Sequence, residues 1–293
     1  MLSVRAWRAY ATYGYLWARR RVGGHKAISV MLRVKDEAEF LYPAVQSIAD
    51  FVDEIVLVDN LSRDATPQII EALAAERPHQ IVCYRYPYEV RKVGVDNLDL
   101  ATDAMGLRSP HLSSMFYNWC LARCSKPYVL KWDGDMIALP QLGAAIDAWR
   151  RSDVQVLVLN GANVHPDFEH LVGAVESNWE ALAAPLSSRL PKWAATLNYD
   201  YPEPRLFPKR CTRYEIVPGF TQKLQTPFLE PPLAPNCIER IEGVSFAHMK
   251  FCKRDPFATY SDDLQRAIAA NLSVGPPLPE AVVQVLMRYR PTR

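Results

Sequence analysis

Three strand-like runs rich in apolar residues, separated by helical patterns, constrain the fold of this chain more than any other feature. The runs cover residues 27–34, 54–60 and 80–86. The first two runs are typical of strands buried on both faces, as in parallel sheets, and the third predicts a further strand. Because a helical pattern lies between each pair, the β-α-β-α-β order predicts a parallel sheet with right-handed crossovers.

The same alternation continues along the chain. The first predicted helix has apolar residues at 41, 45 and 48, and the second starts with Thr66 as N-cap and Pro67 at N1. Further strands are predicted at 128–132 and 154–160, with helical patterns around 116–123 and 142–149. The pattern predicts an α/β protein with a mostly parallel central sheet, helices on both faces, and additional helices at the N- and C-terminal ends.

Bulk composition limits the class of protein. With 293 residues, of which 49% are hydrophobic, the chain can bury a substantial core and fits one large α/β domain with accessory segments. A net charge of +2 and the lack of a recognised nucleic-acid module predict no nucleic-acid partner. The six cysteines form no C-x-x-C pair, and we expect them to be reduced and structural.

The N-terminal segment 1–24 is predicted to be a basic helix rich in aromatic residues, ended by two glycines. No Asp or Glu precedes Asp36. One interpretation is peripheral contact of residues 4–21 with an anionic membrane surface. The alternatives are an arm that packs on the main domain or on a second subunit, and an organellar transit peptide. No apolar run approaches the ~20 residues of a membrane span, so a cytoplasmic location is expected, with the inner face of the membrane as an option.

Polar groups follow three of the predicted strands. The first strand runs into Lys35-Asp36-Glu37, the second ends at Asp59-Asn60, and the strand at 128–132 leads into Asp133-Gly134-Asp135. Ligands of parallel sheets bind outside the carboxyl ends of the strands, so these groups should converge on one crevice. Two carboxylates separated by a glycine can approach one divalent cation, although Asp-Gly is also a common turn dipeptide.

Four sequence blocks resemble glycosyltransferase family 2. The run from Ile28 to Thr66 resembles the opening of the family, with a strand, an acidic turn, a helix, a D-E-I-V-V-V-D-like strand and an S-x-D-x-T turn. YNWCLARCSKPYVLKWDGDM (117–136) is similar to the second block, in which an Asn-bearing helix precedes a D-x-D strand. RLFPKR (205–210) and GVSFAHMKF (243–251) resemble C-terminal features of a bacterial subgroup.

The resemblance implies a GT-A fold within residues 25–255, followed by a helical segment at 256–293. Its nucleotide half would cover about 25–137 and its acceptor half about 138–255. The implied activity is metal-dependent transfer of a sugar from a nucleoside diphosphate donor, with a UDP-sugar favoured, to a glycan or lipid-linked acceptor. The implied reaction is inverting and uses Mn²⁺ or Mg²⁺.

The resemblance also implies roles for particular residues. Those implied for the donor site are Asp36, Glu37, Asp59, Asn118 and Asp133. Those implied for the metal are Asp133, Asp135 and His248, with Asp135 favoured as a direct ligand. A lone histidine is more often structural, so His248 depends on the resemblance alone.

One departure leaves the general base unassigned. Related enzymes often follow the R-L-F block with a V-H-E-like motif, whereas this chain has VPGFTQK at 217–223. The available carboxylates include Glu176, Glu180, Asp200 and Glu215, and sequence does not choose among them. The missing glutamate leaves open a retaining mechanism, or a non-catalytic glycan-binding or scaffold protein. A nucleotidyltransferase is disfavoured because LRVKDEAEF (32–40) has no glycine-rich loop.

Overall fold

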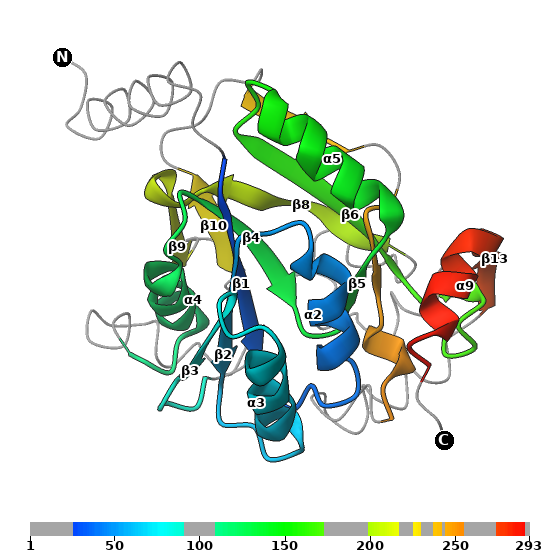
Figure 1. The fold of residues 1–293 in the computed structure, drawn as a ribbon, viewed down its shortest axis with the longest axis horizontal. Coiled ribbons are helices and arrows are strands. Elements are labelled where there is room, and N and C mark those ends of the chain that lie inside the picture. Colours follow the sequence, from blue (N-terminus) through cyan, green and yellow to red (C-terminus); the bar gives the residue numbers. More distant parts are fainter. Residues whose placement is uncertain are drawn as a thin grey trace, which may run out of the picture.

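A computed structural model describes residues 26–90, 109–172, 199–216, 225–229, 237–241, 244–254 and 274–290 (Figure 1). These residues form a nine-stranded mixed sheet with helices on both faces, and two small two-stranded sheets. The predicted α/β class is therefore confirmed, together with a sheet in which most neighbouring strands are parallel.

The first half of the described chain alternates strands and helices as the apolar pattern predicts. Its elements are β1 (Ile28–Val34), α2 (Leu41–Ala49), β2 (Glu54–Asp59), α3 (Thr66–Glu76), β3 (Ile81–Arg85), α4 (Ser113–Arg123) and β4 (Tyr128–Asp133). Strands β3, β2, β1 and β4 lie side by side in that order and are all parallel. β1 and β2 are buried along nearly their whole length, in agreement with their unbroken apolar sequences.

The second half adds antiparallel strands to this sheet. After β5 (Met136–Ala138) and α5 (Pro140–Arg151), the chain forms β6 (Val156–Asn163), β7 (His170–Val172), β8 (Tyr199–Pro208), β9 (Thr212–Ile216), β10 (Gln225–Leu229), β11 (Ile238–Arg240) and β12 (Phe246–His248). β8 lies between β4 and β6 and is antiparallel to both, so β6 again runs in the direction of β4. β12 is parallel to β6 and antiparallel to β5. The carboxyl ends of β1, β4, β6 and β12 therefore meet at one edge of the sheet.

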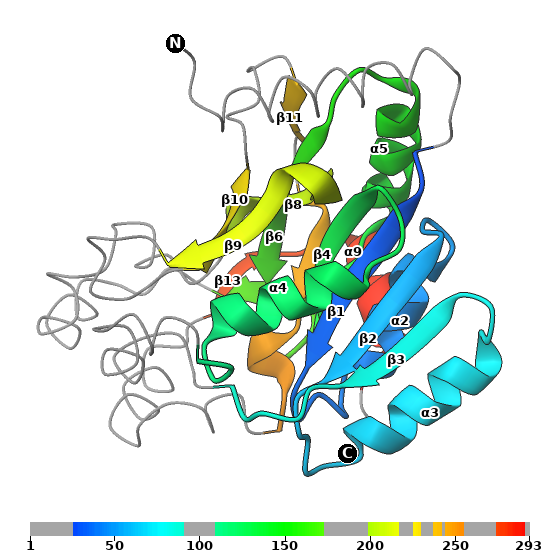
Figure 2. The same ribbon diagram turned by 90° about the vertical axis from the view of Figure 1, so that its left-hand side faces the viewer.

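Apolar side chains cover both faces of the sheet. On one face α2, α3 and α5 pack on alternate residues of the strands, with Val45, Leu73 and Trp149 among the buried contacts. On the other face α4 and β9 cover a second cluster, which includes Met31 and Phe116. Figure 2 shows α4 lying across the sheet on the side opposite α3.

The beginning of α3 differs from the prediction. The helix starts at Thr66 rather than Pro67, and the N–H of Thr66 donates a hydrogen bond to Asp64 Oδ1 at 2.9 Å, so the predicted capping role of Thr66 is wrong. Thr66 Oγ1 instead accepts a hydrogen bond from Glu37 N at 2.8 Å. The hydroxyl thereby holds the turn that follows β1, which is a tertiary contact that a local capping pattern does not reveal.

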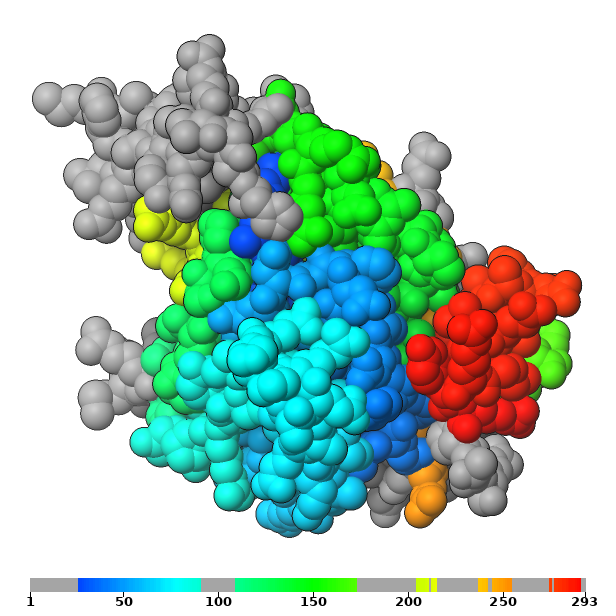
Figure 3. All heavy atoms as spheres, viewed as in Figure 1, coloured from blue at the N-terminus to red at the C-terminus, as the bar shows by residue number. Residues whose placement is uncertain are grey.

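The C-terminal helix α9 (Glu280–Met287) packs on the domain through apolar side chains. Its Leu286 is fully buried with Phe40 and Met249 in a third apolar cluster. The strand before it, β13 (Val274–Pro277), pairs with β7. In Figure 3 this segment, in red, lies against the edge of the domain formed by the blue and green elements.

Two predicted segments lie wholly or partly outside the described residues: the N-terminal helix in 1–24, and residues 256–273 of the C-terminal helical segment. Within the described part of the chain, every helix is too short or too polar to cross a membrane. Cys120 and Cys124 are buried free thiols, as expected for reduced structural cysteines.

Candidate functional site

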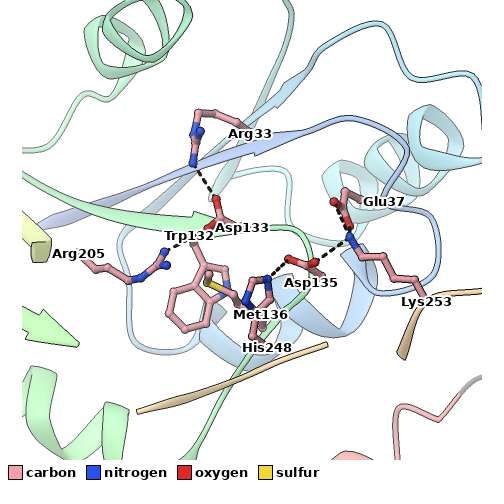
Figure 4. Close-up of polar contacts among 9 residues, drawn as sticks. All are labelled: Arg33, Glu37, Trp132, Asp133, Asp135, Met136, Arg205, His248 and Lys253. Carbon is pink, nitrogen blue, oxygen red and sulfur yellow. Dashed lines mark hydrogen bonds and ion pairs between the residues drawn. The ribbon is translucent and has the colours of Figure 1, made fainter. Parts of the chain in front are cut away.

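The acidic residues of the D-G-D segment lie where β4 ends, and the sheet brings basic side chains to both of them (Figure 4). Asp133 is the last residue of β4, and Gly134 and Asp135 form the turn into β5. Trp132 Nε1 donates a hydrogen bond to Met136 O at 3.0 Å across this turn. The two carboxylates enter separate ionic contacts.

Asp133 is held by arginines from the strands on either side of β4. Arg33, its register partner on β1, places Nη2 2.7 Å from Asp133 Oδ1, and Arg205 on β8 places Nη1 3.2 Å from Oδ2. Both guanidiniums are buried and lie over aromatic rings, those of Tyr117 and Phe246. Burial opposes ionisation, but the positive charges, Arg33 first, hold the pKa of Asp133 well below its usual range.

Asp135 makes a different set of contacts. The antiparallel pairing of β5 with β12 sets His248 opposite Met136, and His248 Nε2 lies 3.2 Å from Asp135 Oδ1. Lys253 Nζ lies 2.7 Å from the other carboxylate oxygen. Burial opposes ionisation here too, yet His248 and Lys253 keep the pKa of Asp135 well below its usual range.

Glu37 joins this second cluster through the same lysine. Lys253 Nζ lies 2.8 Å from each Glu37 carboxylate oxygen. Burial and the nearby Asp135 charge raise the pKa of Glu37 to about 8, although Lys253 and His248 act against the increase. Gly134 has room for no side chain here, since an added Cβ would lie 3.0 Å from Glu37 Cβ and Cγ. The glycine lets the turn pack directly on Glu37.

Asp36 and Asp59 brace the two neighbouring turns. Asp36 has a left-handed backbone (φ 55°), and its Oδ1 accepts a hydrogen bond from Arg63 N at 2.7 Å. Asp59, buried at the end of β2, accepts from Ser62 N at 3.1 Å. Both implied donor-site residues therefore lie at the expected strand ends and hold the loop around residue 62.

Asn118 connects α4 to β9. Its Nδ2 donates to Tyr214 O and its Oδ1 accepts from Tyr214 N, both at 2.8 Å. The structure thus engages both amide atoms of this implied donor-site residue with the backbone of one neighbouring strand. The arrangement stabilises the packing of α4 on the sheet.

We expect Asn118→Ala to lower the free energy of unfolding by about 1–3 kcal/mol, because two part-buried backbone groups lose their partner. Urea denaturation measures the loss. Asn118→Asp, which keeps the acceptor but not the donor, should lie between wild type and alanine. A stable Asn118→Ala protein that fails to bind nucleotide would instead favour the donor-site role.

Few donor atoms are available to the expected metal in the described residues. Within the described ranges, no three His, Cys, Asp or Glu side chains converge on a point where an ion could bind. At the end of β4, Asp135 and His248 provide an oxygen and a nitrogen side by side, while Asp133 points into its own pair of arginines. Divalent ions at phosphate sites commonly take one or two protein ligands plus substrate phosphates. Asp135 and His248 fit that requirement once a diphosphate is bound.

The candidate general bases are not located by the structure. Glu176 and Glu180 lie outside the described residues. Asp200 and Glu215 fall in β8 and β9, but their side chains are likewise outside the described part. The assignment of the base stays a prediction.

Lys253, like Arg33, is a site residue that no sequence motif indicated. It follows a 3-10 turn over Lys250–Cys252, and Arg254 N donates to Glu39 at 2.9 Å. These contacts bring the chain back to the turn after β1. The only signal in the sequence was its position five residues after His248, which is too weak to indicate a contact with Glu37, 216 residues earlier.

The fold and these clusters define a mixed α/β protein with a charged site at the carboxyl ends of its parallel strands, where such sheets bind nucleotides and other phosphorylated ligands. Residues 29–94 match the model of the family described as "Glycosyl transferase family 2". This match confirms the family resemblance over its first block. No curated protein matches the chain.

Solved structures similar to the chain include those of two proteins. One is S. aureus TarS 1–349, at 17% identity and a TM-score of 0.41, covering 90% of this chain and 70% of that one. The chain spans 42% of the longer TarS structure. The other is glucosyl-3-phosphoglycerate synthase from Mycobacterium tuberculosis with Mn²⁺, UDP and glucosyl-3-phosphoglycerate, at 16% identity and a TM-score of 0.41, covering 92% and 81%.

Proposed function

We propose that this protein is a glycosyltransferase that moves a sugar from a nucleoside diphosphate donor, with a UDP-sugar favoured, to a glycan or lipid-linked acceptor. One observation carries the proposal. The first strand of the family segment 29–94 ends at the turn that bears Glu37, and Glu37 belongs to one ionic cluster with Asp135, His248 and Lys253. Peripheral membrane contact through residues 4–21 is part of the proposal only for a lipid-linked acceptor.

In this proposal the donor diphosphate lies at the carboxyl ends of the strands. A divalent cation, Mn²⁺ or Mg²⁺, would be held by Asp135 and His248 and would neutralise charge on the departing diphosphate. Lys253 and the buried guanidiniums of Arg33 and Arg205 supply further positive charge around the crevice. A low-dielectric site makes such fixed charges more effective than they are in water. An acceptor hydroxyl attacks the anomeric carbon, with inversion favoured.

Ligand-dependent thermal stability tests the proposal. Wild type and Asp135→Ala are melted with UDP, GDP or CMP, each with and without Mn²⁺. A ligand that binds only the folded protein stabilises it by about 2.7 kcal/mol at a concentration 100 times its Kd. We expect one nucleotide to raise Tm in a metal-dependent manner in wild type and not in Asp135→Ala.

The control is the response of both proteins to metal or nucleotide alone. Stabilisation by the same nucleotide in both proteins would show that the protein binds a nucleotide but that Asp135 does not contribute to the binding. No change with any nucleotide would contradict the transferase and favour the alternative, a non-catalytic glycan-binding or scaffold protein.

A further inference from the structure

The Lys253 ammonium has a position in the site to which the proposed function gives no specific role. It lies between two carboxylates from different parts of the chain, 2.7 Å from Asp135 and 2.8 Å from Glu37. The side chain is 19% exposed and the two carboxylates 17% or less. A single positive charge thus bridges an acidic pair that water reaches only in part, which is an arrangement that a divalent cation also satisfies.

The backbone holds Lys253 in this place. Met249 N donates to Asp135 O at 2.8 Å, Cys252 N donates to Met249 O at 2.9 Å, and Arg254 N donates to Glu39. The segment from β12 to Arg254 is therefore attached on one side to the D-G-D turn and on the other to the turn after β1. Only the flexible side chain of the lysine needs to move for the carboxylates to be released.

Asp135 is also the carboxylate that we expect to bind the metal. Its Oδ1 contacts His248 and its Oδ2 contacts Lys253, so an ion bound at Asp135 would lie close to the ammonium. Two cations that share one carboxylate repel each other strongly where solvent screening is weak. Lys253 and a divalent ion therefore compete electrostatically for this carboxylate, and each weakens the binding of the other.

We propose that Lys253 is a built-in competitor of the divalent cation: its ammonium neutralises Asp135 and donates a hydrogen bond to Glu37 when no metal is bound, and its charge opposes the binding of a metal to Asp135. The inference rests on the proposed function, which supplies the reason for a divalent ion at this site. It predicts that the protein without donor binds metal weakly and that Lys253 sets this affinity.

Titration of Mn²⁺ without nucleotide, followed by the electron paramagnetic resonance signal of free Mn²⁺, tests the proposal. We expect Lys253→Met to bind Mn²⁺ at least about tenfold more tightly than wild type, since couplings between close charge pairs are commonly that large or larger. Lys253→Arg, which keeps the charge, should remain close to wild type. Lys35→Met is the matched control, because Lys35 pairs with the exposed Glu89 at the end of the same strand.

A double-variant cycle identifies the carboxylate. In an Asp135→Asn background, Lys253→Met should no longer change Mn²⁺ affinity. Equal or weaker Mn²⁺ binding by Lys253→Met than by wild type would overturn the proposal, as would an equal gain in Lys35→Met or in the Asp135→Asn background.

Loss of the lysine can also destabilise the fold, because it leaves two carboxylates without their shared cation. The expected signature is a lower Tm for Lys253→Met that Mn²⁺ restores. If that variant does not fold, Glu37→Gln/Lys253→Met removes one carboxylate with the cation, and it should bind Mn²⁺ more tightly than Glu37→Gln alone. Equal Mn²⁺ affinity of Glu37→Gln/Lys253→Met and Glu37→Gln would also overturn the proposal.

These outcomes separate the inference from the proposed function. The Mn²⁺ titrations contain no nucleotide, so the predicted competition can hold even if no nucleotide binds. Conversely, nucleotide-dependent stabilisation of wild type with unchanged Mn²⁺ affinity in Lys253→Met would overturn the competition alone.

Discussion

Asp133→Ala is expected to lower the free energy of unfolding by about 3 kcal/mol. Asp133 neutralises Arg33 and Arg205, which are 7% and 5% exposed, and breaking a buried ion pair by removing one partner costs about 3–5 kcal/mol. The lower end of that range applies because Asp133 is itself 30% exposed. Urea denaturation at neutral pH measures the change.

The matched control is Asp50→Ala, which removes a surface pair with Arg77 in which the carboxylate is 78% exposed. Its cost should stay below about 1 kcal/mol.

Because the pKa of Asp133 is lowered in the folded protein, its contribution to stability is present above the unfolded pKa of about 3.9 and is lost as pH falls through the folded value. The difference between wild type and Asp133→Ala should therefore persist from pH 8 to pH 5. A difference no larger than that of Asp50→Ala would show that the two arginines do not depend on Asp133.

Asp135→Asn is expected to reduce sugar transfer by at least about 100-fold. Changing even a partner of a metal ligand typically costs about 10–100-fold, and this substitution removes the carboxylate that contacts His248 and Lys253. Asparagine keeps the shape of the side chain, so the fold should be retained. The rate of UDP release from a panel of UDP-sugars provides the measurement, with the donor that wild type uses.

Two controls accompany this variant. Asp50→Asn, on the surface away from the strand ends, should retain the wild-type rate. A circular dichroism melt should show that Asp135→Asn is folded at the assay temperature. Transfer within about threefold of wild type by a folded Asp135→Asn protein would contradict any role of Asp135 in holding the donor or its metal.

The parallel half of the sheet was predictable because its signal is local. The runs at 27–34 and 54–60 became β1 and β2 almost residue for residue, since a strand covered on both faces must be apolar throughout. The polar residues after these strands were also found where predicted, because strand direction alone decides at which edge of a parallel sheet they emerge.

The antiparallel half was not predictable in the same way. Residues 185–237 are rich in proline and have weak periodicity, yet β8 and β9 form there and β8 separates β4 from β6. Strand order of this kind depends on which edges remain open after the first strands have paired. No window of sequence contains that information.

For the candidate site, too, the sequence predicted some features and only the structure revealed others. By itself the sequence determined the class of fold, the strand ends that carry acidic groups, and the resemblance that implies a metal site of Asp133, Asp135 and His248. Only the tertiary structure decided the partners of these groups: two arginines on Asp133, the backbone of Tyr214 on Asn118, and Lys253 between Asp135 and Glu37. The physical reason is that apolar periodicity and strand-end chemistry act over a few neighbouring residues, whereas an ion pair between residues 37 and 253 exists only after the sheet and the turns around it have formed.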